Sequence, residues 1–455
     1  MKKAPITFLI LELRRCFEQL QVTIDDKDLE EIAILIYGCM VGTRRKFHTL
    51  NHVFDVCESL QSPYQVLAGL FHDVVYYQVD EGFSPNVAQQ LAPYITVQPQ
   101  NQALIHTEVP NAPLWWNMLL ATYGFKGGQV LNVFGGMNEL LSTIVAMDTL
   151  APFFSINQLI PIATCIEATI PFRGFDESGF SSFDHMAQRL EQWADAHAPQ
   201  VSKDEIIQAV HLSVDVANED VANFASENTG YFLENTWRLI YEGNVALNDL
   251  ENHAYSVVKY REGLMKTEGF LRYLQTANIF HRFQNVPKSV VYARLTHQAQ
   301  KNVAIAREYL ATKLCFATLL EAFAFATGGD APMSMLIGMM KTETSPQTER
   351  AEYFLTPLES AQIREINPKV LKLLVEGRVG DTGLEIKSSP IAAYIYQFLG
   401  TEGIVAMLDD IKKLFAKEIS YEDFLATCPP YLRSELAKSF AKIAITRATA
   451  LKTFF

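Results

Sequence analysis

Apolar residues recur every three to four positions through most of this chain, the spacing that places them on one face of an α-helix. No run of alternating β-branched residues is long enough to predict a sheet. The sequence therefore predicts an all-α protein. The expected helices cover residues 5–22, 27–41, 66–77, 115–123, 133–146, 159–169, 203–218, 232–243, 254–276, 297–326, 368–376, 389–398, 402–417 and 432–450, and a further helix is expected to contain His48 and to end before Ser62-Pro63.

Polar segments interrupt this pattern at a few places. The stretch from residue 80 to residue 110 is rich in Pro, Gln and Asn and is predicted as loop and short helix. Ser202-Lys-Asp-Glu205 is a capping box, so a helix is expected to begin there. Residues 342–352 are the most linker-like stretch of the second half, which predicts an internal boundary near them.

Composition and charge narrow the class of protein. Apolar residues make up 49% of the 455 residues and charged residues 20%, a globular balance. The formal net charge of −13 argues against a nucleic-acid surface, which needs clustered Lys and Arg. Six scattered cysteines show no metal-knuckle spacing. The stretch 314–327 is apolar but too short to span a bilayer, so a cytoplasmic protein that binds no membrane is expected.

The candidate chemistry lies between residues 47 and 77. His48 and His52 are four residues apart, so on a helix both rings would leave the same face. His72 and Asp73 follow in a second apolar segment, and Asp215 lies within the apolar helix that starts after Ser202. Burying so many polar groups is costly unless they bind each other or an ion. A divalent metal ion is the simplest ligand that would use them all.

These residues resemble the HD superfamily of metal-dependent phosphohydrolases. F-H-T-L-N-H-V-F-D-V, which contains His48 and His52, is similar to the Y-H-N-x-x-H-A-x-D-V signature of cyclic-nucleotide phosphodiesterases. Bacterial HD phosphohydrolases carry a similar H-N-x-x-H, followed at short spacing by an F-H-D segment like that at His72-Asp73. The resemblance covers roughly residues 30–230 and none of the second half.

The resemblance implies a site and a division of the chain. It makes His52, His72, Asp73 and Asp215 the ligands of one divalent ion (Mg, Mn, Fe or Zn), and His48 the general acid, with Asp73 counted as catalytic too. It also implies an HD-type helical domain over residues 1–230, followed by a helical region of unassigned role over 231–455. Tyr76 stands where H-D-x-x-H supplies a further histidine, which counts against a second ion, and no purine-gripping glutamine is identified.

Other residues compete for these roles. Asp148 is the main alternative to Asp215 as the last carboxylate ligand, and Glu167 is the second. Asp55 is interpreted as a hydrogen-bond acceptor for a ligand imidazole. The neighbouring His211 is interpreted as a support for Asp215 or a core histidine. Arg173 and Lys46 are candidates for binding a phosphate, although a single basic residue in a loop is usually just exposed to solvent.

The leading hypothesis is a phosphohydrolase acting on a nucleotide or other small phosphoester, with a metal-activated water as nucleophile and His48 as general acid. A homodimer is left open. The alternative is a non-catalytic HD-type sensor or interaction protein that binds metal or nucleotide. A third hypothesis is a mixed-valent di-iron oxygenase, which would need further His or carboxylate ligands between Asp73 and Asp215. In that interval His106 is the only histidine candidate before His185.

Overall fold

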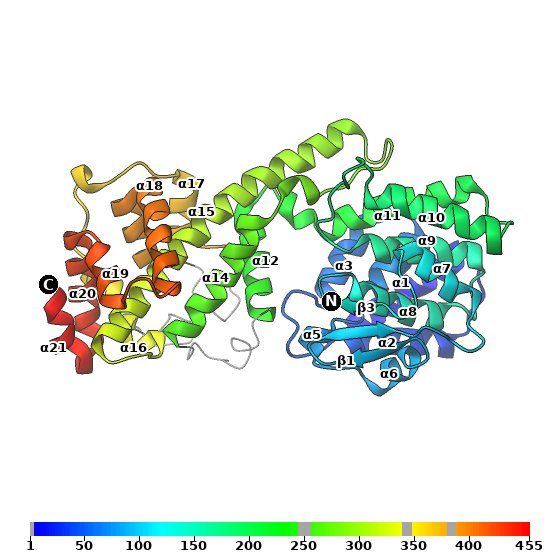
Figure 1. Cartoon of the computed structure of the whole chain (residues 1–455), viewed down its shortest axis with the longest axis horizontal. Helices are drawn as coiled ribbons and strands as arrows, with labels where there is room; N and C mark the ends of the chain where they lie inside the picture. The colour runs from blue at the N-terminus through cyan, green and yellow to red at the C-terminus, as the bar shows by residue number, and fades with distance from the viewer. Residues whose placement is uncertain (1–3, 244–255, 339–347, 380–387) are drawn as a thin grey trace. The chain divides into compact units, whose positions relative to one another are not determined.

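The computed structural model describes residues 4–243, 256–338, 348–379 and 388–455. These residues are predominantly helical (Figure 1), which confirms the predicted all-α class. The predicted boundary near 342–352 lies partly outside the described residues, since 339–347 are among those not described.

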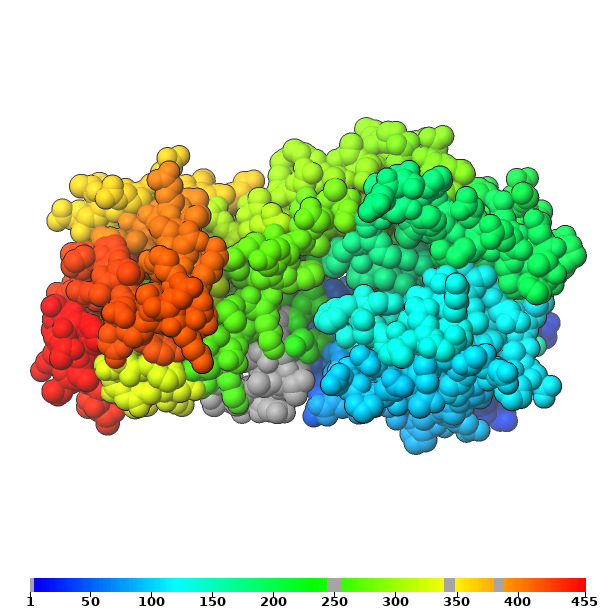
Figure 2. Space-filling model, in the orientation of Figure 1, coloured from blue at the N-terminus to red at the C-terminus, as the bar shows by residue number. Residues whose placement is uncertain are grey.

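A small antiparallel sheet departs from the prediction of loop and short helix over residues 80–110. Strands β1 (Ile95–Gln98), β2 (Gln102–Ile105) and β3 (Val130–Asn132) pair in the order β1-β2-β3. Gln100 and Asn101 adopt positive φ angles of 66° and 56° at the turn that joins β1 to β2. Strands of three or four residues are too short for their alternation to be recognised in the sequence. The sheet belongs to the part of the chain coloured blue to cyan in Figure 2.

Contacts divide the chain into two units. Unit 1 comprises residues 1–225 and 275–299, and unit 2 comprises residues 226–274 and 300–455. The sequence analysis divides the chain after residue 230 and assigns 275–299 to its second half. In the structure, residues 275–299 belong to unit 1.

Unit 1 is built around two apolar helices, α4 and α9. All residues of α9 from Leu159 to Ala168 are buried, and α9 packs against α4, α7, α8 and α11. A helix that is apolar on all sides belongs in a core. The helices of unit 1 are α1 (Pro5–Gln19), α2 (Asp26–Met40), α3 (Leu50–Ser59), α4 (Pro63–Phe71), α5 (Tyr77–Asp80), α6 (Pro85–Leu91), α7 (Leu114–Tyr123), α8 (Met137–Leu150), α9 (Ile156–Ala168), α10 (Ser182–His197) and α11 (Lys203–Asp220).

Unit 2 is helical throughout its described part. In it, α12 packs against α14, α17 against α18, and α20 against α16 and α21. Helix α15 is divided between the units, with residues 289–299 in unit 1 and 300–327 in unit 2. The remaining helices are α12 (Thr229–Glu242), α14 (Val257–Tyr273), α15 (Ser289–Thr327), α16 (Met333–Ile337), α17 (Pro368–Glu376), α18 (Pro390–Phe415), α19 (Tyr421–Thr427), α20 (Pro430–Ile443) and α21 (Ala448–Leu451).

Two helices of the described chain, α15 and α18, are long and apolar enough to cross a membrane by length and composition alone. The apolar part of α15 is 83% buried within the protein, and that of α18 is 44% buried. The stretch 314–327, which looks short in the sequence, is the end of a 39-residue helix. Buried core helices pass the same test, so the finding is weak evidence for a membrane span. A break at Gly400, with φ of 70°, separates the two helices predicted on either side of it.

Candidate metal centre

The His48 segment enters the site as a loop and not as a helix. Helix α3 begins at Leu50, with Thr49 as its N-cap, so His48 precedes the helix and His52 lies in its first turn. The prediction that both histidines share one helix face is therefore wrong. Their rings are nevertheless neighbours, with centroids 5.9 Å apart. The His48 ring stacks on Tyr76 at a centroid distance of 4.1 Å.

His72 lies at the C-terminal end of α4, where it is almost fully buried. Its Nδ1 lies 2.8 Å from the carbonyl oxygen of Gly69. A carbonyl oxygen only accepts hydrogen bonds, so Nδ1 must carry the proton and donate it. In the neutral ring, Nε2 then has a free lone pair. Metal-binding histidines commonly donate their second ring N–H in this way, which fixes the tautomer and the orientation of the ring.

Three predicted ligands come together around this nitrogen. The ligand atoms of His52, His72 and Asp73 lie within 4.8 Å of one another. His72 Nε2 is 3.1 Å from Asp73 Oδ2, and His52 Nε2 is 3.7 Å from the same oxygen. Both atoms are buried, and neither has a hydrogen-bond partner, so the contact between His72 Nε2 and Asp73 Oδ2 does not have hydrogen-bond geometry. Two buried lone-pair acceptors that face each other are destabilising unless a proton on Nε2 or a metal ion lies between them.

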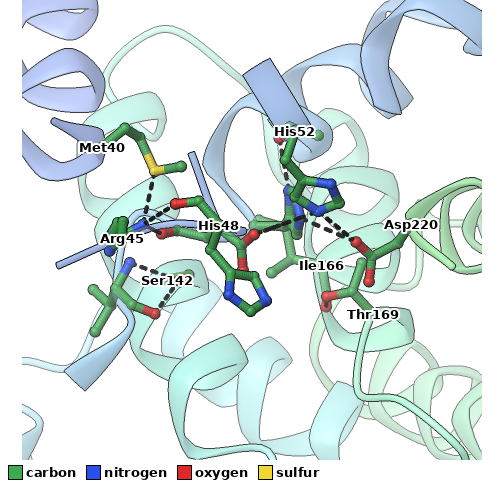
Figure 3. A network of polar contacts seen from close by, with 12 residues as sticks. Met40, Arg45, His48, His52, Ser142, Ile166, Thr169 and Asp220 are labelled. Atoms are coloured by element: carbon green, nitrogen blue, oxygen red, sulfur yellow. Dashed lines mark hydrogen bonds and ion pairs between the residues drawn. The ribbon is translucent and has the colours of Figure 1, made fainter. Parts of the chain in front are cut away.

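The second carboxylate in the cluster is Asp220 and not Asp215. Asp220 Oδ1 lies 3.0 Å from His52 Nε2 and 3.4 Å from His72 Nε2 (Figure 3). Asp215 is exposed, and its Oδ2 accepts a hydrogen bond from Gln65 Nε2 at 3.3 Å. Five residues correspond to about 140° of rotation on an α-helix, so the two side chains leave α11 in different directions. The prediction of Asp215 as a ligand of this cluster is corrected accordingly.

The electrostatics of the cluster also indicate a cation. Burial alone would lower the pKa of His72, but the carboxylates of Asp73 and Asp220 outweigh it and raise this pKa well above its ordinary value. Burial would raise the pKa values of Asp73 and Asp220, and the surrounding histidines lower both well below the usual range. Asp220 is also the last residue of α11, where the helix dipole disfavours a carboxylate. Both acids are therefore ionised, and the cluster attracts positive charge.

The geometry allows His52, His72 and Asp73 to hold a divalent ion, with Asp220 Oδ1 beside both imidazoles. Two ligand atoms that each lie about 2.1 Å from one ion are at most about 4.2 Å apart. The four imidazole–carboxylate distances in the cluster, 3.0, 3.1, 3.4 and 3.7 Å, all lie within that limit. Two imidazoles with two carboxylates suit Mn²⁺, Fe²⁺, Zn²⁺ or Mg²⁺.

Arg45 fixes the loop that carries His48. Its guanidinium is buried and pairs with Asp80 through Nε–Oδ1 and Nη2–Oδ2 contacts of 2.9 and 2.6 Å. Its Nη1 donates to the backbone carbonyl of Asp73 at 2.6 Å. One side chain thus ties the loop before α3 to the turn that presents Asp73. The sequence analysis did not identify Arg45 or Asp80, because an Arg-Arg pair in a loop is normally solvated.

Helix α8 supports the same turn from the other side. Ser142 Oγ accepts a hydrogen bond from the backbone N–H of Val75 at 3.1 Å, and Asn138 Oδ1 accepts one from Tyr77 at 3.1 Å. Glu139 lies between them in sequence, and burial together with the charges of Asp73 and Asp220 raises its pKa to about 7. Glu139 is therefore within electrostatic range of both carboxylates, and the sequence analysis did not identify it.

The remaining candidates lie outside the cluster. Asp148 is exposed on α8, and Asp55 is exposed on α3. Glu167 is buried in α9 and forms an ion pair with Arg173. His211 Nε2 contacts Gln284 Oε1 at 3.2 Å, and His106 contacts Thr96 and a backbone carbonyl. None of these five side chains adds a ligand to the centre formed by His52, His72, Asp73 and Asp220, which we call the metal centre. No protein-family model, curated protein or solved structure matches this chain.

Proposed function

We propose that this protein is a metal-dependent phosphohydrolase acting on a small phosphoester, with a nucleotide as one candidate substrate. The observation that carries the proposal is the convergence of His52, His72, Asp73 and Asp220, in which His72 Nε2 and Asp73 Oδ2 are buried without a hydrogen-bond partner. The resemblance of the His48–His52 and His72-Asp73 segments to HD phosphohydrolases supplies the reaction class.

In this proposal, His52, His72, Asp73 and Asp220 hold one divalent ion. When bound, such an ion lowers the pKa of a water molecule and neutralises charge on a phosphoryl oxygen. Nδ1–H of His72, anchored on Gly69, keeps Nε2 directed into the centre. The Arg45–Asp80 pair keeps the Asp73 turn in place, so the chain positions its ligands before substrate arrives.

His48 has the role of general acid in the proposal. Its ring is half-buried and stacked on Tyr76, next to His52 but not within the group of ligand atoms. The positive charge of His48 contributes to the low pKa of Asp73, which places it within electrostatic range of the metal centre. An imidazolium at that position donates its proton to the departing alkoxide, a contribution of about 10²- to 10⁴-fold in rate.

The test loads the full-length protein with Mn²⁺ and measures turnover on a panel of phosphodiesters and phosphomonoesters. His48→Gln is expected to keep the metal and lose most of the turnover. His72→Ala is expected to lose both. Asp215→Asn is the matched control, because it removes an exposed carboxylate from the same helix as Asp220 and is expected to keep both.

A protein that binds metal yet cleaves no phosphoester would contradict the proposal. If a nucleotide then raised the melting temperature without being converted, the alternative of a non-catalytic metal- and nucleotide-binding sensor would take its place.

A further inference from the structure

Unit 1 contains a cavity formed by residues that the metal centre does not use, with both charged and aromatic side chains in its lining. Its volume is about 240 Å³, and it lies between the loop that follows α9 and the segment that leads into α15. Arg173, Asn278, His281, Arg282 and Tyr292 line it. Pockets that enclose whole drug-sized ligands are typically about 300–1,000 Å³, so this cavity suits a single small group.

Two arginines of this cavity have donors that lack a partner. Arg173 pairs with Glu167 through Nη1 and Nη2 at 2.5 and 3.0 Å, which leaves its buried Nε–H without a hydrogen-bond partner. Arg282 donates through Nη2 to Asn285 Oδ1 at 3.2 Å, and its Nε–H is also buried and unpartnered. A buried donor on a charged group that makes no hydrogen bond is destabilising. Two of the arginines that line the cavity therefore each have an unsatisfied guanidinium N–H group.

The acidic groups nearby do not neutralise both arginines. Glu167 balances Arg173, and Asp176, in the adjoining loop, is occupied by His185 Nε2 at 2.7 Å and by two backbone N–H groups. Arg282 has no carboxylate partner among the described residues. The cavity thus carries a net positive charge, in a protein whose overall charge is −13.

His281 and Asn278 add further polar side chains to the lining. Burial and the charge of Arg173 lower the pKa of His281 to about 4, so its ring is neutral near pH 7 and can donate one N–H. The backbone of His281 is held by the Asn218 amide of α11, with contacts of 2.7 and 3.0 Å. A Cβ at Gly174 would lie 2.8 Å from Asn278 Nδ2, so the two walls approach closely at this point.

We propose that the cavity lined by Arg173, His281 and Arg282 binds a phosphoryl group. Guanidinium N–H groups bind phosphate oxygens with strong, charge-assisted hydrogen bonds, and the neutral imidazole and the Asn278 amide add donors for the remaining oxygens. The group is either inorganic phosphate or the phosphate of a small metabolite. The inference does not rest on the phosphohydrolase proposal, because none of these residues belongs to the metal centre.

The test measures binding of inorganic phosphate to the metal-free, full-length His72→Ala protein by isothermal titration calorimetry. This background removes phosphate binding at the metal centre. Adding Arg282→Gln is expected to weaken phosphate binding about tenfold or more, while acetate binds neither protein. Arg294→Gln is the control, since it removes the same charge from an exposed position of the same segment and is expected to leave binding unchanged.

A second titration with adenosine monophosphate separates the two sources. Binding of inorganic phosphate supports the free ion, whereas Arg282-dependent binding of the monophosphate alone supports a phosphorylated metabolite. The proposal is overturned if neither binds, or if binding is equal in the Arg282→Gln and Arg294→Gln proteins. Unchanged circular dichroism of the Arg282→Gln protein would exclude misfolding as the reason for a loss.

Discussion

Buried charged side chains occur in both units, but they are balanced in different ways. In unit 2, Arg261 Nε lies 2.7 Å from Glu321 Oε2, and Arg378 Nε lies 3.1 Å from Glu234 Oε2. In the metal centre of unit 1, two carboxylates face two imidazoles, and no Lys or Arg among the described residues pairs with either carboxylate. Both oxygens of Glu321 are paired, with Arg261 and with the hydroxyl of Tyr421, whereas His72 Nε2 and Asp73 Oδ2 in unit 1 have no hydrogen-bond partner.

This contrast separates structural charges from functional ones. A buried ion pair whose partners satisfy each other adds little net stability but is costly to break. Carboxylates gathered around the lone pairs of histidines are destabilising on their own, and such an arrangement is typical of sites that bind an ion. The following predictions test this comparison, from the largest expected effect to the smallest.

Breaking a completed pair in unit 2 should cost the most. Glu321→Gln removes the charge that balances buried Arg261, although its amide still reaches the hydroxyl of Tyr421. An uncompensated buried charge typically lowers the free energy of unfolding by about 3–5 kcal/mol. Urea denaturation measures this loss, and metal binding by the folded variant should be unchanged. A loss below about 1 kcal/mol would show that this pair is not balanced as described.

The pH dependence of the free energy of unfolding should show that His281 is buried in its neutral form, beside the positive charge of Arg173. Its pKa is about 4 in the folded protein, and an unfolded histidine titrates near 6.5. Its contribution to folding is therefore complete above pH 6.5 and is lost as the pH falls toward 4. Between pH 7 and pH 4, the wild type should lose up to about 3 kcal/mol more unfolding free energy than His281→Phe. Parallel stability profiles for the two proteins would rule out a buried neutral His281.

Metal should stabilise unit 1 through the metal centre alone. At a Mn²⁺ concentration of 100 times Kd, the free energy of unfolding should rise by about 2.7 kcal/mol in the wild type. The same addition should leave His72→Ala unchanged, because the lone pair of Nε2 is gone. Thermal unfolding with and without Mn²⁺ measures the effect, and an equal shift in both proteins would place the ion elsewhere.

Removing the rejected carboxylate of α8 should have the smallest effect. Asp148 is exposed, so Asp148→Asn is expected to change the free energy of unfolding by less than about 0.5 kcal/mol and to leave Mn²⁺ affinity unchanged. Equilibrium dialysis with Mn²⁺ checks this prediction. Weaker metal binding would return Asp148 to the ligand set.

The all-α class was predictable because helical spacing of apolar residues persists through most of the chain. The strands were not, since each pairs over only three or four residues. His52, His72 and Asp73 were identifiable because polar groups in apolar segments need a partner. Asp215 was preferred because Val214 and Val216 flank it, but adjacent residues point to different sides of a helix. Asp220 follows Asn218 and Glu219 in a polar sequence, and only the position of α11 beside α3 and α4 brings it to the histidines.

The ligand set can be tested most directly by metal content. The protein is expressed with excess Mn²⁺, desalted and analysed by inductively coupled plasma mass spectrometry as wild type, Asp220→Asn and Asp215→Asn. The account predicts about one ion per chain in the wild type and in Asp215→Asn, and a loss of most of that metal in Asp220→Asn. Metal retained by Asp220→Asn but lost from Asp215→Asn would contradict the assignment of the centre to His52, His72, Asp73 and Asp220.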